Sequence, residues 1–157
     1  MLREIQERMR MVKKGMKVRN TTKVTAEVTE EMFAQFEGEV IHPAYSTVSM
    51  VYHMEWASRK LLIPHLEEGE EGMGSAVTVK HIAPSGLGTK VEVTATVCEV
   101  TDREVITEVF LTNEYGVIGK GEVKQAILPK EKIETKLAEQ TASKAQTRNK
   151  NTGGNEG

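Results

Sequence analysis

Residues 47–66 (TVSMVYHMEWASRKLLIPHL) have apolar positions at helical spacing over about five turns. One carboxylate, Glu55, lies at the edge of the apolar stripe, because at about 100° per residue Val48, Val51 and Leu62 fall within about 60° of it. On the same helical wheel Ala57 lies far round the opposite side. A carboxylate on the rim of a buried stripe needs a partner, a proton or a water-lined pocket, since bare burial is costly. The pattern predicts a long central helix in which Glu55 is the residue to explain.

Alternating apolar and polar residues predict five strands around this helix. One strand precedes the helix, at 23–29, and four follow it, at 75–83, 91–97, 105–111 and 117–128. Short turn sequences (PSGLG, TDRE and NEYG) separate the last four, and Pro129 ends the last because it cannot donate a ladder hydrogen bond. Consecutive strands with tight turns are antiparallel, and one amphipathic helix can cover a face of such a sheet. We therefore predict an α+β hotdog fold, a five-stranded antiparallel sheet wrapped around one long central helix.

Two segments between these elements lack a clear period. Residues 30–46 contain Phe33 and Phe36 and lead to the helix, and a connection of this length suggests a lid or binding loop. Residues 67–74 (EEGEEGMG) read as a solvated acidic turn. The acidic turn lacks histidine and the spacing of metal ligands, so we expect neither a metal nor a cofactor.

The two ends of the chain differ from its middle. Residues 1–14 place Leu2, Ile5, Met9 and Val12 at helical spacing among basic residues, which predicts a basic amphipathic helix as an extension. Residues 15–140 form the predicted domain, and its last eleven residues are compatible with a short helix. Residues 141–157 have almost nothing apolar, so we expect a disordered tail.

Composition narrows the partners and the location that we expect for this chain. The chain has 157 residues and a net charge of -2, which gives no reason to expect nucleic acid. No apolar run approaches the ~20 residues that span a bilayer, so we expect no membrane partner. One cysteine, Cys98, excludes an internal disulfide and favours the reducing cytoplasm. A sheet with a single helix usually buries more apolar surface by dimerising, so we expect a homodimer or a higher homo-oligomer.

Three polar residues meet on the predicted architecture. Glu55 lies on the helix edge, Thr47 lies with Ser46 at the helix start, and His81 is in phase with Val77 on the strand that faces the helix. Hydroxyl, imidazole and carboxylate groups on facing layers are the groups that acyl transfer uses.

Each of these residues also has a simpler interpretation. Ser46 or Thr47 is a good N-cap, which stabilises a helix by about 1 kcal/mol. A histidine at a strand end is more often structural than catalytic. Glu55 can pair with Arg59 four residues on, at a few tenths of a kcal/mol. The conjunction of the three groups is more informative than any one of them.

Residues 53–97 resemble the hotdog thioesterases of the fluoroacetyl-CoA thioesterase-like family. The resemblance rests on MEWA in the helix, the P-x-L-x-x-G-E turn, a glycine before the strand and V-x-H at its end. With GMKV at 15–18 it spans roughly residues 15–128. It implies hydrolysis of an acyl-CoA thioester to a carboxylic acid and free CoA, with catalytic roles for Thr47, Glu55 and His81.

We expect the substrate to contact Gly74, which matches the turn glycine of the family, and also Ser46 and Phe36. Two positions depart from the fluoroacetate-selective member. Ile41 stands where that member has phenylalanine, and Lys124-Gln125 stands where it has arginine. These departures leave the acyl group open.

Helix geometry limits the proposed site. Eight residues at about 1.5 Å each separate Thr47 from Glu55 by about 12 Å. The two side chains can meet only if the helix starts later than Thr47 or a second subunit supplies one of them, so we predict a site at a dimer interface. A non-catalytic acyl-CoA-binding or regulatory hotdog protein is the main alternative, and a hotdog dehydratase is a third, because it also uses histidine and a carboxylate.

Overall fold

The computed structural model describes residues 1–2 and 16–152, with the side chains of 149–152 left aside. The amphipathic helix predicted at 1–14 therefore lies almost entirely outside the described residues. The elements run in the order β1 (Thr21–Glu27), η1 (Glu30–Met32), β2 (Phe33–Phe36), β3 (Glu39–Tyr45), α2 (Thr47–Leu62), η2 (Ile63–His65), β4 (Glu70–His81), β5 (Lys90–Val100), β6 (Glu104–Asn113), β7 (Gly116–Pro129) and α3 (Lys130–Thr152).

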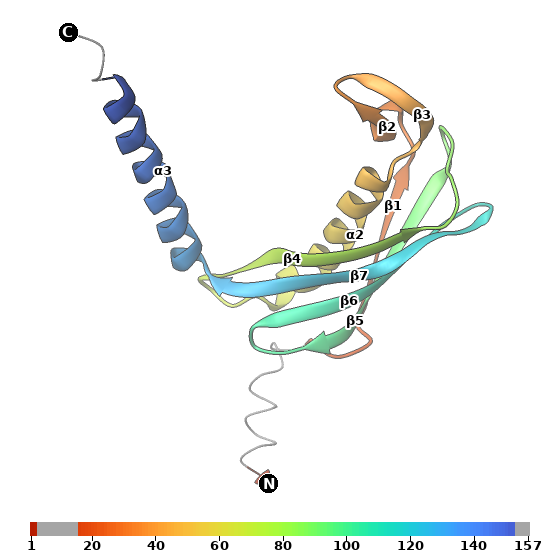
Figure 1. Cartoon of the computed structure of the whole chain (residues 1–157). Coiled ribbons are helices and arrows are strands. Elements are labelled where there is room, and N and C mark those ends of the chain that lie inside the picture. The colour runs from red at the N-terminus through yellow and green to blue at the C-terminus, as the bar shows by residue number, and fades with distance from the viewer. Residues whose placement is uncertain (3–15, 153–157) are drawn as a thin grey trace.

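The five longer strands form one antiparallel sheet in the order β1-β5-β6-β7-β4. The sheet curves along α2, and the β2–β3 hairpin lies beyond the N-terminal end of that helix (Figure 1). Inward-facing valines of β1 and β5 pack against Met50 and Met54 of α2 in the main core. The predicted hotdog architecture is confirmed. No helix among the described residues is long and apolar enough to cross a membrane.

The segment 30–46, predicted as a loop, contains a two-stranded hairpin. The turn between β2 and β3 is Glu37-Gly38, and both residues have positive φ, 51° and 78°. Two residues in this conformation make the type I′ turn that suits the twist of a hairpin. Register irregularities on both sides of Ala34 break the alternation that would have revealed the strands in the sequence.

Three element boundaries also differ from the sequence prediction. α2 ends at Leu62 and a 3-10 turn follows, because Pro64 has no N–H to continue the helix. β4 already begins at Glu70, inside the predicted acidic turn. α3 continues to Thr152, past Thr141 where we expected a disordered tail. α3 projects away from the sheet (Figure 1).

Glycines let α2 lie close to the sheet. A Cβ at Gly119 of β7 would stand 2.7 Å from the sulfur of Met50, and one at Gly121 would stand 2.8 Å from Cε of Met54. On β4, a Cβ at Gly72 would stand 2.5 Å from Cδ2 of Leu62. The absence of side chains at these positions fixes the depth at which the helix packs.

The buried stripe of α2 differs from the one expected. Ala57 is buried with Met50, Met54 and Leu61, whereas the helical wheel placed it far round the opposite side. The predicted buried stripe was centred near Val48, which is apolar but 74% exposed in the structure. Glu55 is consequently on the exposed side of the helix in the single chain, about 130° from the middle of the buried stripe.

A bulge in β4 decides which residues of that strand face α2. The pairing with β7 runs Gly74↔Gln125 and then Ala76↔Lys124, so Ser75 is the extra residue. Side chains alternate along a strand, and one extra residue reverses the alternation. Gly72 and Gly74 face the helix before the bulge, and Val77 and His81 face it afterwards.

We expect Gly121→Ala to lower the thermal unfolding midpoint by several degrees. The new methyl group would overlap the carbonyl oxygen of Thr78 and crowd Met54, and overpacking of this kind costs about 1–3 kcal/mol. Gly86→Ala is the control, because nothing lies within 4 Å of its added Cβ. Equal midpoints for the two variants would contradict the proposed close packing of α2.

Candidate active site

The N-terminal end of α2 is capped by Ser46. Its hydroxyl accepts a hydrogen bond from the backbone N–H of Ser49 at 3.0 Å, and its backbone is extended. The cap leaves the N–H groups of Thr47 and Val48 at the first two helical positions, where an α-helix has no internal acceptor for them. The helix dipole adds partial positive charge there. This end of α2 is therefore suited to an oxygen that carries negative charge.

Thr47 and His81 are brought together from distant parts of the chain. Oγ1 of Thr47 lies 2.9 Å from Nδ1 of His81, a hydrogen bond between residues 34 apart in sequence. Thr47 begins α2 and is exposed, while His81 ends β4 and is half-buried. The hydroxyl–imidazole pair has the geometry in which a histidine accepts a proton from a nucleophile or holds it by hydrogen bonding.

A pocket of about 540 Å³ opens at this pair. It lies where β3, the start of α2 and the end of β4 meet. Small side chains form much of its wall, and its polar groups include a second imidazole, that of His42. The lining residues are Ala34, His42, Ala44, Tyr45, Ser46, Thr47, His81, Ile82, Ala83 and Pro84.

Glu55 lies two turns further along α2, with its carboxylate over β4. A Cβ at Gly74 would stand 2.5 Å from Oε1 of Glu55, so the glycine makes room for the carboxylate. Arg59, the partner that the sequence allowed, instead donates to Glu71 at 2.9 Å and to the carbonyl oxygen of Gly72 at 3.1 Å. Within the part of the chain that the structure describes, Glu55 is therefore not engaged by Arg59.

The remaining predicted residues are divided between two places. Ser46 lines the pocket as well as capping α2. Gly74 lies beside Glu55 and not among the pocket residues. Phe36 is 70% exposed at the tip of the β2–β3 hairpin and does not line the pocket. A single chain thus brings together Thr47, His81 and Ser46, and separately Glu55 and Gly74.

Sequence reasoning missed a buried polar pair beside the pocket. The hydroxyl of Tyr45 lies 2.6 Å from Nδ1 of His53, and the two rings stack at 5.7 Å between centroids. Burial lowers the pKa of His53 and raises the pKa of Tyr45 well above its usual range. Both groups are therefore neutral at neutral pH. The sequence spacing of eight residues carries no recognisable signal for this pair.

Gln125 of β7 is another buried polar residue, and it lies on the part of the sheet that Glu55 faces. It is 3% exposed, stands opposite Gly74 in the sheet, and its Nε2 has no hydrogen-bond partner in the described part of the chain. The sequence had marked this position only as a departure from the family's arginine. Its companion Lys124 forms an ion pair with Glu104 at 3.1 Å.

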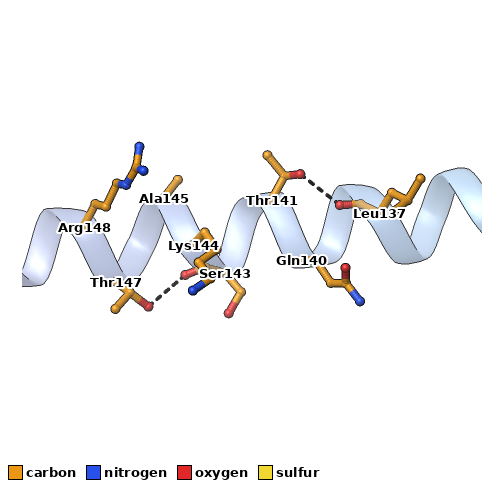
Figure 2. Close-up of a pocket in the computed structure, with 8 residues that line it drawn as sticks. All are labelled: Leu137, Gln140, Thr141, Ser143, Lys144, Ala145, Thr147 and Arg148. Atoms are coloured by element: carbon orange, nitrogen blue, oxygen red, sulfur yellow. Dashed lines mark hydrogen bonds between the residues drawn. The ribbon is translucent and has the colours of Figure 1, made fainter. Parts of the chain in front are cut away.

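The flank of α3 has a hollow of about 940 Å³, but its geometry differs from that of the pocket at His81. All the residues that line it come from this one helix, and Thr141 and Thr147 bond back to carbonyl oxygens of their own helix (Figure 2). Among the residues that the structure describes, no second element lines it with further polar groups. Among the described residues, no group of three or more His, Cys, Asp or Glu side chains is placed to hold a metal ion.

Comparison with known proteins identifies the family of the chain. Residues 28–131 match the family described as fluoroacetyl-CoA-specific thioesterase. The chain belongs to that family. The fluoroacetyl-CoA thioesterase of Streptantibioticus cattleyicolor is 34% identical over 97 residues, which cover 62% of this chain and 70% of the relative.

Solved structures support the same assignment. A thioesterase superfamily member from Thermus thermophilus is 38% identical with a TM-score of 0.78, over 83% of this chain and 96% of its own. A variant of fluoroacetyl-CoA thioesterase in complex with acetyl-CoA is 26% identical with a TM-score of 0.75, over 80% and 99%. The sequence-based assignment to a hotdog thioesterase is confirmed. These relatives favour a hydrolase over the non-catalytic protein and the dehydratase that the sequence left open.

The buried His53 predicts how stability depends on pH. Burial lowers its pKa in the folded chain, whereas the unfolded chain binds the proton as the pH falls below about 6.5. Stability from this group is therefore complete above about pH 6.5 and is lost as the pH falls towards the folded pKa. We expect the thermal midpoint of the wild-type protein to fall between about pH 8 and pH 5.5 more steeply than that of His53→Asn.

The Asn variant is the matched comparison, because its amide keeps a polar group near Nδ1 and does not titrate. All other titrating groups, including Tyr45, are common to both proteins. Parallel midpoint curves over this range would contradict the interpretation.

Proposed function

We propose that Thr47, His81 and Glu55 carry out the acyl-CoA thioester hydrolysis of this family at an interface between two protomers. The reaction converts an acyl-CoA thioester into a carboxylic acid and free CoA. The observation that carries the proposal is the 2.9 Å contact between Thr47 and His81 at the mouth of a pocket. The N-terminal end of α2 lies at the same pocket and supplies N–H groups for the carbonyl oxygen.

The contact supports two routes that differ in the position of one proton. If Nδ1 of His81 is unprotonated, it accepts the Thr47 proton as Oγ1 attacks the carbonyl carbon. The C–S bond then breaks, the CoA thiolate takes up the proton, and water hydrolyses the acyl-threonine. If Nδ1 carries the proton, it donates to Thr47, and Nε2 accepts a proton from water as the water oxygen attacks the carbonyl carbon. The C–S bond then breaks, and the CoA thiolate takes up that proton from Nε2. In both routes the developing oxyanion faces the N–H groups at the start of α2.

Glu55 is placed for a role across a dimer interface. β4 is an edge strand of the sheet and leaves one side of its backbone without a strand partner in the described chain. Apolar side chains near this edge are exposed, among them Met73 at 43% and Tyr52 at 65%. Exposed apolar surface beside a free edge supports pairing with a second copy of the chain.

The position of the bulge supports a particular register for that pairing. In an antiparallel β4–β4 pair related by a twofold axis near Thr78, Gly74 stands roughly opposite the partner subunit's His81. Their β7 partners Gln125 and Gly119 are each three positions from Glu122, which pairs with Thr78. Glu55, which lies over Gly74, then reaches the partner's Thr47–His81 pair. In this arrangement Glu55 orients the imidazole or the attacking water. The arrangement accounts for the separation of about 12 Å between Thr47 and Glu55 within one helix.

The choice of acyl group is expected to depend on the pocket wall and on the β2–β3 hairpin beside it. Ile41, which the sequence resemblance sets against a phenylalanine of the fluoroacetate-selective member, is 50% exposed on β3. Substrate selection is tested by thiol release from acetyl-, fluoroacetyl-, long-chain and aryl-CoA thioesters. We place the reaction in the cytoplasm, in agreement with a single cysteine, Cys98, which is unpaired and exposed.

Removing either the Glu55 carboxylate or the His81 imidazole is expected to abolish most hydrolysis. Glu55→Gln and His81→Ala should each lower the rate of thiol release by about 10²–10⁴-fold, the usual contribution of a general acid or base. Circular dichroism should show folded proteins, because both side chains lie outside the buried core. A wild-type rate in either variant would refute the assigned role of that residue.

Mixing the two inactive proteins distinguishes a site within one chain from a site between chains. If Glu55 serves the partner's Thr47–His81 pair, each heterodimer contains one intact site. A co-refolded equal mixture should then recover about a quarter of the wild-type rate, because half of the dimers are mixed and each has one of two sites. If Glu55 serves its own chain, no heterodimer contains an intact site. A mixture as inactive as its components would therefore exclude the shared site.

A further inference from the structure

Tyr45 forms the part of the pocket wall that adjoins both catalytic candidates. It is 2% exposed, and it directly precedes Ser46 and Thr47 at the start of α2. Its ring meets the imidazole of His81 edge to face, with centroids 6.4 Å apart and an interplanar angle of 72°. Movement of this ring therefore displaces either the imidazole or the first residues of the helix.

The hydroxyl of Tyr45 is fixed from inside the protein. It lies 2.6 Å from Nδ1 of His53 and 3.3 Å from the carbonyl oxygen of Ser49. Between these two groups it can act as both donor and acceptor, so either neutral tautomer of His53 satisfies it. A buried hydroxyl with two partners has one favourable position.

His53 is itself held on its other sides. It is 3% exposed, and the rings of Tyr52 and Trp56 lie 5.2 Å and 6.2 Å from it between centroids. The side chain of Trp56 in turn lies under the ammonium group of Lys60, at 4.9 Å. The contacts thus run from the middle of α2, through His53 and Tyr45, to the ring of His81.

We propose that Tyr45 is a positioning residue for the Thr47–His81 pair and that the buried His53 holds it in place. The proposal rests on the function assigned above to Thr47 and His81. Tyr45 contributes no proton to the reaction. Its ring fixes the plane of the His81 imidazole, and its hydroxyl ties that ring to α2, the helix on which Thr47 stands. A small displacement of reacting groups is enough to slow catalysis considerably.

A second buried pair on α2 provides a matched control. Oγ of Ser58 lies 2.6 Å from Oγ1 of Thr107, so it joins the C-terminal half of α2 to β6 with a contact as short as that of Tyr45 and His53. Ser58 and Thr107 are fully buried, and neither lines the pocket. Loss of this contact therefore shows what a purely structural hydrogen bond on the same helix does.

The test compares Tyr45→Phe with Ser58→Ala by steady-state kinetics and thermal unfolding. Both variants lose one buried hydroxyl and should lose thermal stability. We expect Tyr45→Phe to lower kcat on the order of tenfold with KM little changed, because binding contacts remain while alignment is lost. Ser58→Ala should keep the wild-type kcat.

The His53 variants test the connection between the two residues. His53→Leu removes the hydrogen bond and should lower kcat as Tyr45→Phe does, whereas His53→Asn keeps a polar group near Nδ1 and should restore much of the rate. The double variant Tyr45→Phe/His53→Leu should be no slower than either single variant, because both remove the same contact.

The controls also keep failure of the proposal separate from failure of the assigned function. If Tyr45→Phe is destabilised but retains the wild-type kcat while His81→Ala is inactive, Tyr45 is structural and the positioning role is wrong. If His81→Ala itself retains the wild-type rate, the function assigned to the pair is wrong. Equal falls in kcat for Tyr45→Phe and Ser58→Ala would also overturn the proposal.

Discussion

The close contact between α2 and the strands β4 and β7 determines where the functional groups stand. Met50, Met54 and Leu62 occupy space that side chains at Gly119, Gly121 and Gly72 would fill. The helix therefore lies deeper on the sheet than ordinary side chains would permit. Its N-terminal end comes within hydrogen-bonding distance of the end of β4 as a consequence, and the Thr47–His81 contact follows from backbone packing.

The bulge at Ser75 also determines which residues of β4 face α2. A regular β4 would turn either Gly74 or His81 away from the helix, because these positions differ by an odd number of residues. With one extra residue, both face α2, one beside Glu55 and the other beside Thr47. The same strand thereby carries one candidate site residue on each side of the bulge, an arrangement that suits two copies related by a twofold axis.

Much of the fold could be predicted from the sequence because its signals are local. Alternation identified all five strands of the main sheet, and the phase of Val77 and His81 correctly placed the imidazole towards the helix. The helical wheel failed for Ala57 and Val48, because several apolar residues surround the helix and only tertiary packing decides which of them are buried. The β2–β3 hairpin was missed because irregular pairing around Ala34 hides its period.

The candidate site could be predicted only in part for a similar reason. The family resemblance supplied Thr47, Glu55 and His81, and the rise of the helix separated two of them. Neither the pairing of Tyr45 with His53 nor the burial of Gln125 leaves a pattern in the sequence, since each depends on contacts between elements. For α3 the error was of another kind: the polar composition after Thr141 suggested disorder, whereas the structure continues the helix to Thr152.

The two-stranded β2–β3 sheet has a consequence for how this protein can diversify. Its tip, from Phe36 to Ile41, is exposed, while its base is anchored through Phe33 and Tyr45 in the core. Apart from the bridge between Ala44 and Gly86, it is paired with itself and not with the main sheet. Substitutions at the tip therefore leave the Thr47–His81 contact undisturbed. Natural selection can change the exposed tip of the hairpin and the proposed catalytic pair independently of one another.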